Sequence, residues 1–150
     1  MADILTHALL GAACAPDHPI IGAAFGVAPD VAQIPMNIYS FVKYRRLATG
    51  SDWDLAPRNL RDLYDIMHGV FMPAIVLFMA WFFAPFFVPF IMAYMSHILI
   101  DAPLHESTAF LFPLSNRNVS IGKNWWEDWR IPVVTISISA LIVAVQRGLI

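Results

Sequence analysis

Histidine and aspartate residues flank the most apolar stretch of this chain. His68 precedes residues 69–96, which contain no Asp, Glu, Lys or Arg, and His97 and Asp101 follow them. An ionisable group at the centre of a bilayer costs about 2.5–3.5 kcal/mol, so such groups usually line a functional site. Imidazole and carboxylate groups are ligands of zinc and related divalent metals. The pattern therefore predicts a metal site at the edge of an apolar region.

His97 and Asp101 form the most informative pair. Their i, i+4 spacing places both side chains on one face of a helix, where they can bind the same metal. The alternative interpretation is a His–Asp hydrogen bond that only closes the end of the helix.

His7, Asp30 and His68 extend this pattern toward the N-terminus. His7 lies in an apolar segment, and Asp30 ends the next one after a proline turn. The same order of His, proline turn and Asp then repeats from His68 to Asp101. An antiparallel helical hairpin returns to the level at which it begins. We therefore expect His7, Asp30, His68, His97 and Asp101 to converge on a divalent metal, with zinc as the leading candidate.

Asp65 and His105 are additional candidate ligands. Asp65 precedes His68 by three residues and has three interpretations: a ligand, a partner that orients the imidazole, or a helix cap. His105 is either a ligand or a surface-loop residue. Three imidazoles and two carboxylates exceed one open tetrahedral zinc site and suit a two-metal site with a bridging carboxylate. Such a site predicts hydrolysis by metal-activated water.

Composition places these residues in an integral membrane protein. Hydrophobic residues make up 59% of the chain and charged residues 13%, about half the charged fraction of a typical soluble domain. The net charge of −2 gives no reason to expect nucleic acid as a stable partner. We expect one all-α domain over residues 1–150, a membrane helical bundle of two helical hairpins and a C-terminal transmembrane helix.

The apolar segments and their proline breaks predict the helices. Parts of 31–67 look amphipathic, and a polar loop is expected over 102–130. The expected helices span residues 2–14, 20–28, 68–84, 87–101 and 131–146.

The distribution of positive charge predicts the orientation of this bundle. Eight of the nine Lys and Arg residues lie within 31–67 and 102–130, which flank the expected site. Because cytoplasmic loops are enriched in Lys and Arg, the multi-pass protein should place its site on the cytoplasmic side.

Several short motifs resemble those of the bacterial membrane-bound metal-dependent hydrolases. They are scattered over residues 6–115 and comprise Thr6-His7-Ala8-Leu9-Leu10-Gly11, Ala28-Pro29-Asp30, His68, Ser96-His97-Ile98-Leu99-Ile100-Asp101 and Phe112-Pro113-Leu114-Ser115. That family is similar in its ligand pattern to zinc-dependent phospholipase C and related single-strand nucleases. The resemblance implies phosphodiester or phosphoester hydrolysis by a bacterial membrane protein, which we expect in the inner membrane. A site at headgroup depth would favour a phospholipid as the substrate.

The segment around His68 departs from the family pattern. Family members typically carry His-Arg-Gly-x-Thr-His-Ser there, whereas this chain lacks the first His and has Gly69 in place of Ser. Asp65 is a candidate replacement for the lost ligand. The alternative function is a membrane protein that binds metal without catalysis, as a carrier or as a structural partner with a degenerate site.

Overall fold

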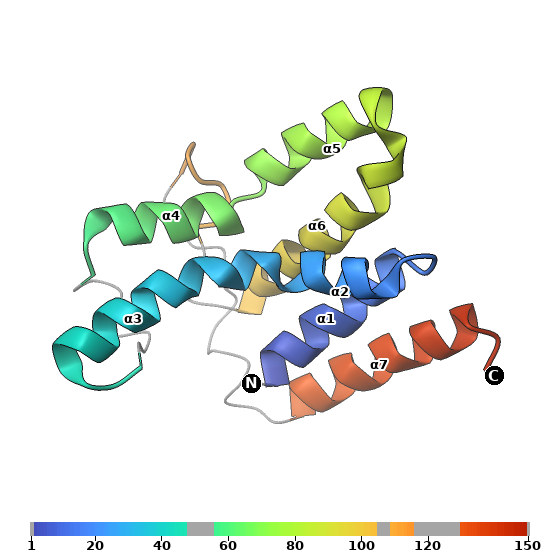
Figure 1. The fold of residues 1–150 in the computed structure, drawn as a ribbon, viewed down its shortest axis with the longest axis horizontal. Coiled ribbons are helices and arrows are strands. Elements are labelled where there is room, and N and C mark those ends of the chain that lie inside the picture. Colours follow the sequence, from blue (N-terminus) through green and yellow to red (C-terminus); the bar gives the residue numbers. More distant parts are fainter. Residues whose placement is uncertain (1, 48–55, 105–108, 116–129, 150) are drawn as a thin grey trace.

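The computed structural model describes residues 2–47, 56–104, 109–115 and 130–149, and every regular element within them is a helix (Figure 1). The all-α prediction is thus confirmed. In chain order, the elements are α1 (Ala2–Cys14), α2 (Pro19–Val27), the 3-10 helix η1 (Ala28–Ala32), α3 (Gln33–Tyr44), α4 (Arg58–His68), α5 (Phe71–Phe83), the 3-10 helix η3 (Pro85–Phe87), α6 (Val88–Leu104) and α7 (Arg130–Gln146).

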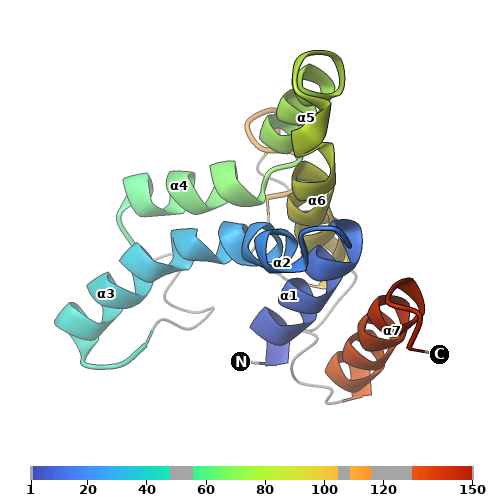
Figure 2. The same cartoon turned by 45° about the vertical axis from the view of Figure 1, so that its right-hand side comes forward.

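Three helices form the centre of the fold. Helices α1 and α2 pack against each other as a hairpin, and both contact α6. Helix α7 lies along α1, whereas α5 packs mainly on α6. Helix α5 and the start of α6 project away from the rest of the protein (Figures 1 and 2). The two expected hairpins are therefore present, and α6 joins them.

Glycine permits the close approach of α1 and α2. A Cβ atom added to Gly11 would lie under 3.0 Å from the Gly22 carbonyl oxygen, and one added to Gly26 would lie equally close to the His7 carbonyl oxygen. Small residues let helix backbones approach in this way. The contact fixes the height of His7 on α1 relative to the end of α2, where Asp30 follows.

The sequence-based boundary at His68 is wrong. His68 ends the polar helix α4 and does not open the apolar helix, which begins at Phe71 after a break at Gly69 and Val70. The axes of α4 and α5 differ by 42°, and the Val70 amide donates a hydrogen bond to the Phe110 carbonyl across the break. His68 lies just before this bend, and its side chain is fully buried.

The remaining boundaries follow local sequence signals. Pro19 occupies the first turn of α2, where its missing amide hydrogen costs nothing. The 31–67 segment supplies two helices, α3 and α4, and the region expected as a loop from 102 begins with the last residues of α6. His105 lies outside the described residues.

The described helices do not by themselves show the expected membrane bundle. Within the described residues, one helical segment, Pro85–Ala102, is long and apolar enough to cross a membrane. The bent pair α4 and α5 would provide a second span if it crosses as one unit, and the apolar parts of α1 and α7 are shorter. The helix at Arg130–Gln146 matches the predicted C-terminal segment but falls below the length of a full span.

Substitution of Gly22 tests the close helix contact. Alanine stabilises an ordinary helix by about 1 kcal/mol relative to glycine, but at Gly22 the added methyl would overlap the Gly11 carbonyl oxygen. We expect Gly22→Ala to lower the free energy of unfolding by about 1–3 kcal/mol. Thermal unfolding in detergent measures the effect, and Ala24→Ser on the exposed face of α2 is the control. A stabilised Gly22→Ala variant would contradict the packing.

Candidate metal centre

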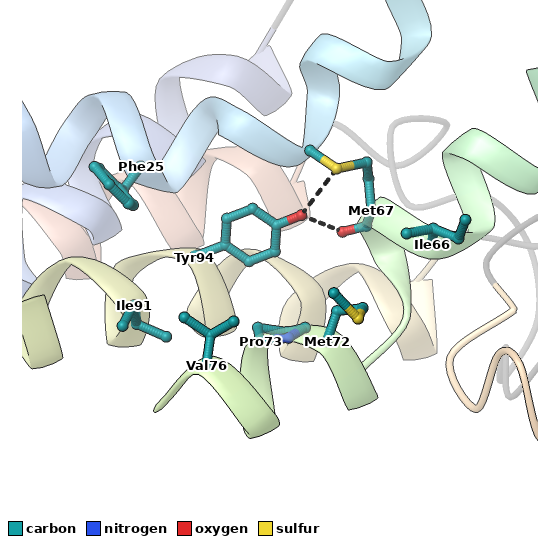
Figure 3. A pocket seen from close by; sticks show the side chains of 8 residues that line it. All are labelled: Phe25, Ile66, Met67, Met72, Pro73, Val76, Ile91 and Tyr94. Carbon is teal, nitrogen blue, oxygen red and sulfur yellow. Dashed lines mark hydrogen bonds between the residues drawn. The ribbon is translucent and has the colours of Figure 1, made fainter. Parts of the chain in front are cut away.

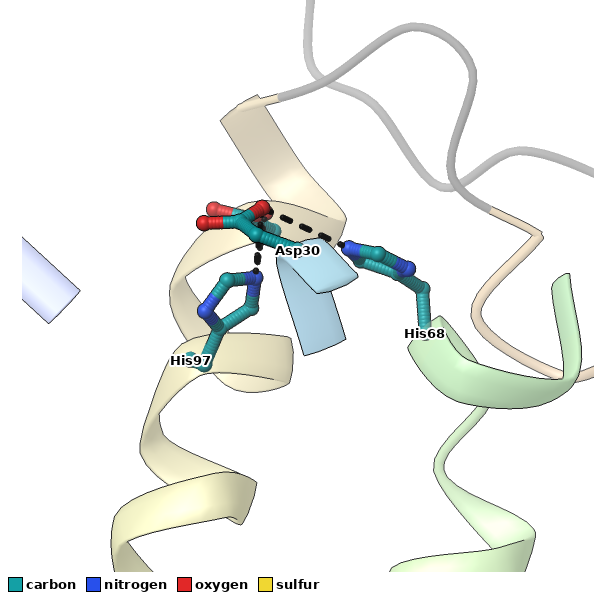
Figure 4. Close-up of side chains that lie close together, drawn as sticks. Asp30, His68 and His97 are labelled. Carbon is teal, nitrogen blue, oxygen red and sulfur yellow. Dashed lines mark ion pairs between the residues drawn. The ribbon is translucent and has the colours of Figure 1, made fainter. Parts of the chain in front are cut away.

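Four side chains from three elements come together near one end of the helical core. Asp30 lies on η1, His68 ends α4, and His97 and Asp101 lie one turn apart on α6. Each offers a ligand atom, and these four atoms all lie within 4.8 Å of one another. The side chains of Asp30, His68 and His97 point at a common position (Figure 4).

Backbone carbonyl groups fix both histidine rings. The Nδ1 atom of His97 lies 2.7 Å from the Gly26 carbonyl oxygen, and Nδ1 of His68 lies 3.1 Å from the Tyr64 carbonyl oxygen. A carbonyl oxygen only accepts hydrogen bonds, so each Nδ1 must carry the proton. In a neutral ring, Nε2 then holds the lone pair, and in both rings Nε2 faces the carboxylates. This is the arrangement of metal-binding histidines, whose other nitrogen donates to a carbonyl or carboxylate.

The distances within the group match the size of a metal coordination shell. Nε2 of His97 lies 3.0 Å from Asp101 Oδ2 and 3.6 Å from Asp30 Oδ1, and Nε2 of His68 lies 4.0 Å from the same Asp30 oxygen. Ligands about 2.1 Å from a tetrahedral zinc ion are about 3.4 Å from one another. The four residues therefore need only small movements to surround a cation.

The burial of these residues makes uncompensated negative charge costly at this site. The side chains of His68, His97 and Asp101 are fully buried, and that of Asp30 is 12% exposed. Two carboxylates so close together in a weakly hydrated site repel each other, and each is costly to bury without a compensating charge. A divalent cation or protonated imidazoles would supply that charge. Of these two, only the cation would also bind the Nε2 lone pairs of both His68 and His97.

His7 lies beside the four residues but is not one of them. Its Nε2 atom is 3.1 Å from Asp101 Oδ1, and its ring stacks on the His97 ring with centroids 3.7 Å apart. The two oxygens of Asp101 thus face His7 and His97, respectively. Asp30, His68, His97 and Asp101 therefore come together, whereas His7 contacts the group through Asp101 and the His97 ring. Metal binding by these residues stays a prediction.

Asp65 does not belong to the group of four. It is half-buried on α4, and burial raises its pKa to about 6, with a further rise from Asp62 and an opposing effect of Arg61. His105 lies outside the described residues, so its role as a ligand stays a prediction.

The sequence analysis missed the groups that orient the two imidazoles. The carbonyls of Gly26 and Tyr64 hold the rings, and the Tyr64 ring stacks on His68 with centroids 3.8 Å apart. Every residue has a carbonyl group, so no sequence signal marks these two. Tyr64 could have been noticed because its i, i+4 spacing places it on the His68 face of α4.

Comparisons of this chain with protein-family models, with curated proteins and with solved structures find no match.

Removal of His97 should weaken metal binding strongly. We expect the purified protein to bind Zn²⁺, and His97→Ala to weaken binding at least 100-fold because it removes one of four converging ligands. Calorimetric titration with Zn²⁺ measures affinity and stoichiometry. His18→Ala is the matched control, since His18 is exposed in the turn before α2. Equal affinity in both variants would exclude His97 as a ligand.

Asp65 should make stability depend on pH. The folded protein holds the Asp65 proton more tightly than the unfolded chain does, so the stability that Asp65 contributes is complete below about pH 4 and is lost as the pH rises through 6. Asp65→Asn should therefore stabilise the protein at pH 8, by about 1 kcal/mol after allowance for solvent screening, and change little at pH 3.5. Thermal unfolding at both pH values, with Asp17→Asn as control, checks this. If Asp65→Asn is instead less stable than the parent at pH 8, the ionised Asp65 carboxylate has a favourable partner in the folded protein.

Proposed function

We propose that this protein is a membrane-embedded, metal-dependent hydrolase that acts on a phosphoester. The observation that carries the proposal is the pair of histidines whose Nδ1 atoms are held by carbonyl groups while their Nε2 atoms face Asp30 and Asp101. A divalent cation bound there would polarise a phosphoryl oxygen and activate water.

The side chains around the proposed cation position have different roles. His68 and His97 hold their lone pairs in place through the Tyr64 and Gly26 carbonyl groups. Asp101 connects the ring of His97 to that of His7, so His7 positions the carboxylate or shares it with a second cation. Asp30 is the group nearest to solvent and marks the side from which water and substrate approach.

The exposed surface of α5 supports a location in the membrane. Phe78, Trp81 and Phe83 are 64%, 67% and 77% exposed, respectively, and belong to an apolar helix that leaves most of its circumference uncovered. A helix that is hydrophobic all round is normally buried in protein or in lipid. We propose that α5 and α6 enter the bilayer together, in a multi-pass protein of the bacterial inner membrane.

The basic residues support a cytoplasmic site. Helices α3 and α4 and the turn that follows α3 carry five of them, and these elements adjoin η1 and the end of α4, which supply Asp30 and His68 (Figure 1). Arg147 lies at the other end, where its guanidinium donates to the Pro16 carbonyl group. By the positive-inside rule, the end that carries the metal centre faces the cytoplasm.

A structural metal site is the second candidate. Catalytic zinc usually has three protein ligands and an open position, whereas four protein ligands close a tetrahedral shell. Asp30, His68, His97 and Asp101 provide four. A closed site would stabilise the junction of α4, η1 and α6 without catalysis.

Turnover distinguishes these functions. We expect the zinc- or manganese-loaded protein to hydrolyse bis(p-nitrophenyl) phosphate, and Asp101→Asn to reduce kcat/KM at least 100-fold because a ligand between two histidines is lost. Release of p-nitrophenolate is the measurement, and His18→Ala should retain full activity. If the parent binds metal but hydrolyses the substrate no faster than Asp101→Asn does, the result would support the structural site and contradict the hydrolase.

A further inference from the structure

An apolar pocket lies next to the metal centre. Its volume is about 240 Å³, and eight residues of α2, α4, α5 and α6 line it: Phe25, Ile66, Met67, Met72, Pro73, Val76, Ile91 and Tyr94 (Figure 3). The Tyr94 hydroxyl donates to the Met67 carbonyl oxygen over 2.6 Å and contacts the Met67 sulfur. The main polar group on the pocket wall is therefore already engaged, and the rest of the wall is hydrocarbon and sulfur.

Three lining residues connect this pocket to the metal centre. Met67 immediately precedes His68, and Tyr94 lies one helical turn before His97. Phe25 precedes Gly26, whose carbonyl oxygen holds the His97 ring. The same backbone segments thus carry the pocket wall on one side and the metal ligands on the other.

The pocket opens onto the apolar exterior of the protein. Ile66, Met72 and Val76 are each about half exposed, while Pro73 and Ile91 at its base are buried. A dry apolar cavity of about 150 Å³ is enough to bind benzene, so this larger pocket accommodates a segment of a hydrocarbon chain. Water would gain few hydrogen bonds there, which favours an apolar occupant.

We propose that this pocket binds one hydrocarbon chain of a membrane lipid phosphoester whose headgroup phosphate reaches the metal centre. The proposal rests on the hydrolase function and names its substrate class. An anionic headgroup complements a bound cation, and the chain complements the pocket wall. A lipid that enters at the exposed face of α5 would move laterally from the bilayer into the pocket.

Photolabelling tests the pocket without requiring turnover. The probe is a decyl phosphonate with a diazirine at the chain end, applied to the zinc-loaded protein, and peptide mass spectrometry locates the adducts. We expect adducts on the segments that contain Met72 and Ile91. Val76→Trp, which fills the pocket mouth, should reduce them at least fivefold. Phe78→Trp on the exposed surface of the same helix is the matched control and should leave them within twofold.

Each outcome bears on one claim. Adducts spread along exposed α5, or insensitive to Val76→Trp, would overturn the pocket assignment. A decyltrimethylammonium probe that labels the pocket as strongly as the phosphonate would overturn the lipid phosphoester assignment. Hydrolysis of bis(p-nitrophenyl) phosphate without pocket labelling would leave the hydrolase standing and reject the chain site. Pocket labelling in a protein without turnover would support the chain site and reject the hydrolase.

Discussion

The structure depends on bringing two carboxylates and two imidazoles together where little water reaches them. Asp30 and Asp101 would repel each other across this space, and their burial costs free energy unless a positive charge lies between them. The carbonyl groups of Gly26 and Tyr64 hold the Nδ1 protons of His97 and His68, so both Nε2 lone pairs face the same position. A cation satisfies all four groups at once, whereas a proton satisfies one nitrogen at a time.

The helix packing serves this arrangement. Gly11, Gly22 and Gly26 let α1 and α2 cross without side chains between them, which sets His7 beside Asp101 and presents the Gly26 carbonyl group to α6. The bend between α4 and α5 then delivers His68 from a polar helix, while α5 continues as an apolar one. If α5 and α6 enter a bilayer as proposed, a site at this junction of polar and apolar helices would lie at the depth of the lipid headgroups.

Much of this fold could be predicted from residue patterns, and the failures have physical causes. The proline turn over residues 15–19 located the end of α1. The repeated order of His and Asp in two hairpins anticipated that Asp30, His68, His97 and Asp101 come together, with His7 against Asp101. The helix that carries His68 was misassigned, because the long apolar run masked the break at Gly69. The carbonyl groups that orient the imidazoles could not be predicted, since only tertiary packing decides which carbonyl meets which ring.

X-ray absorption at the zinc edge of the purified, zinc-loaded protein tests the central claim most directly. The account predicts nitrogen and oxygen neighbours at about 2.0–2.1 Å, with outer-shell scattering from two imidazole rings that falls by half in His68→Ala. A spectrum of hydrated zinc, or one that is the same in the parent and in His68→Ala, would contradict a metal centre formed by these residues.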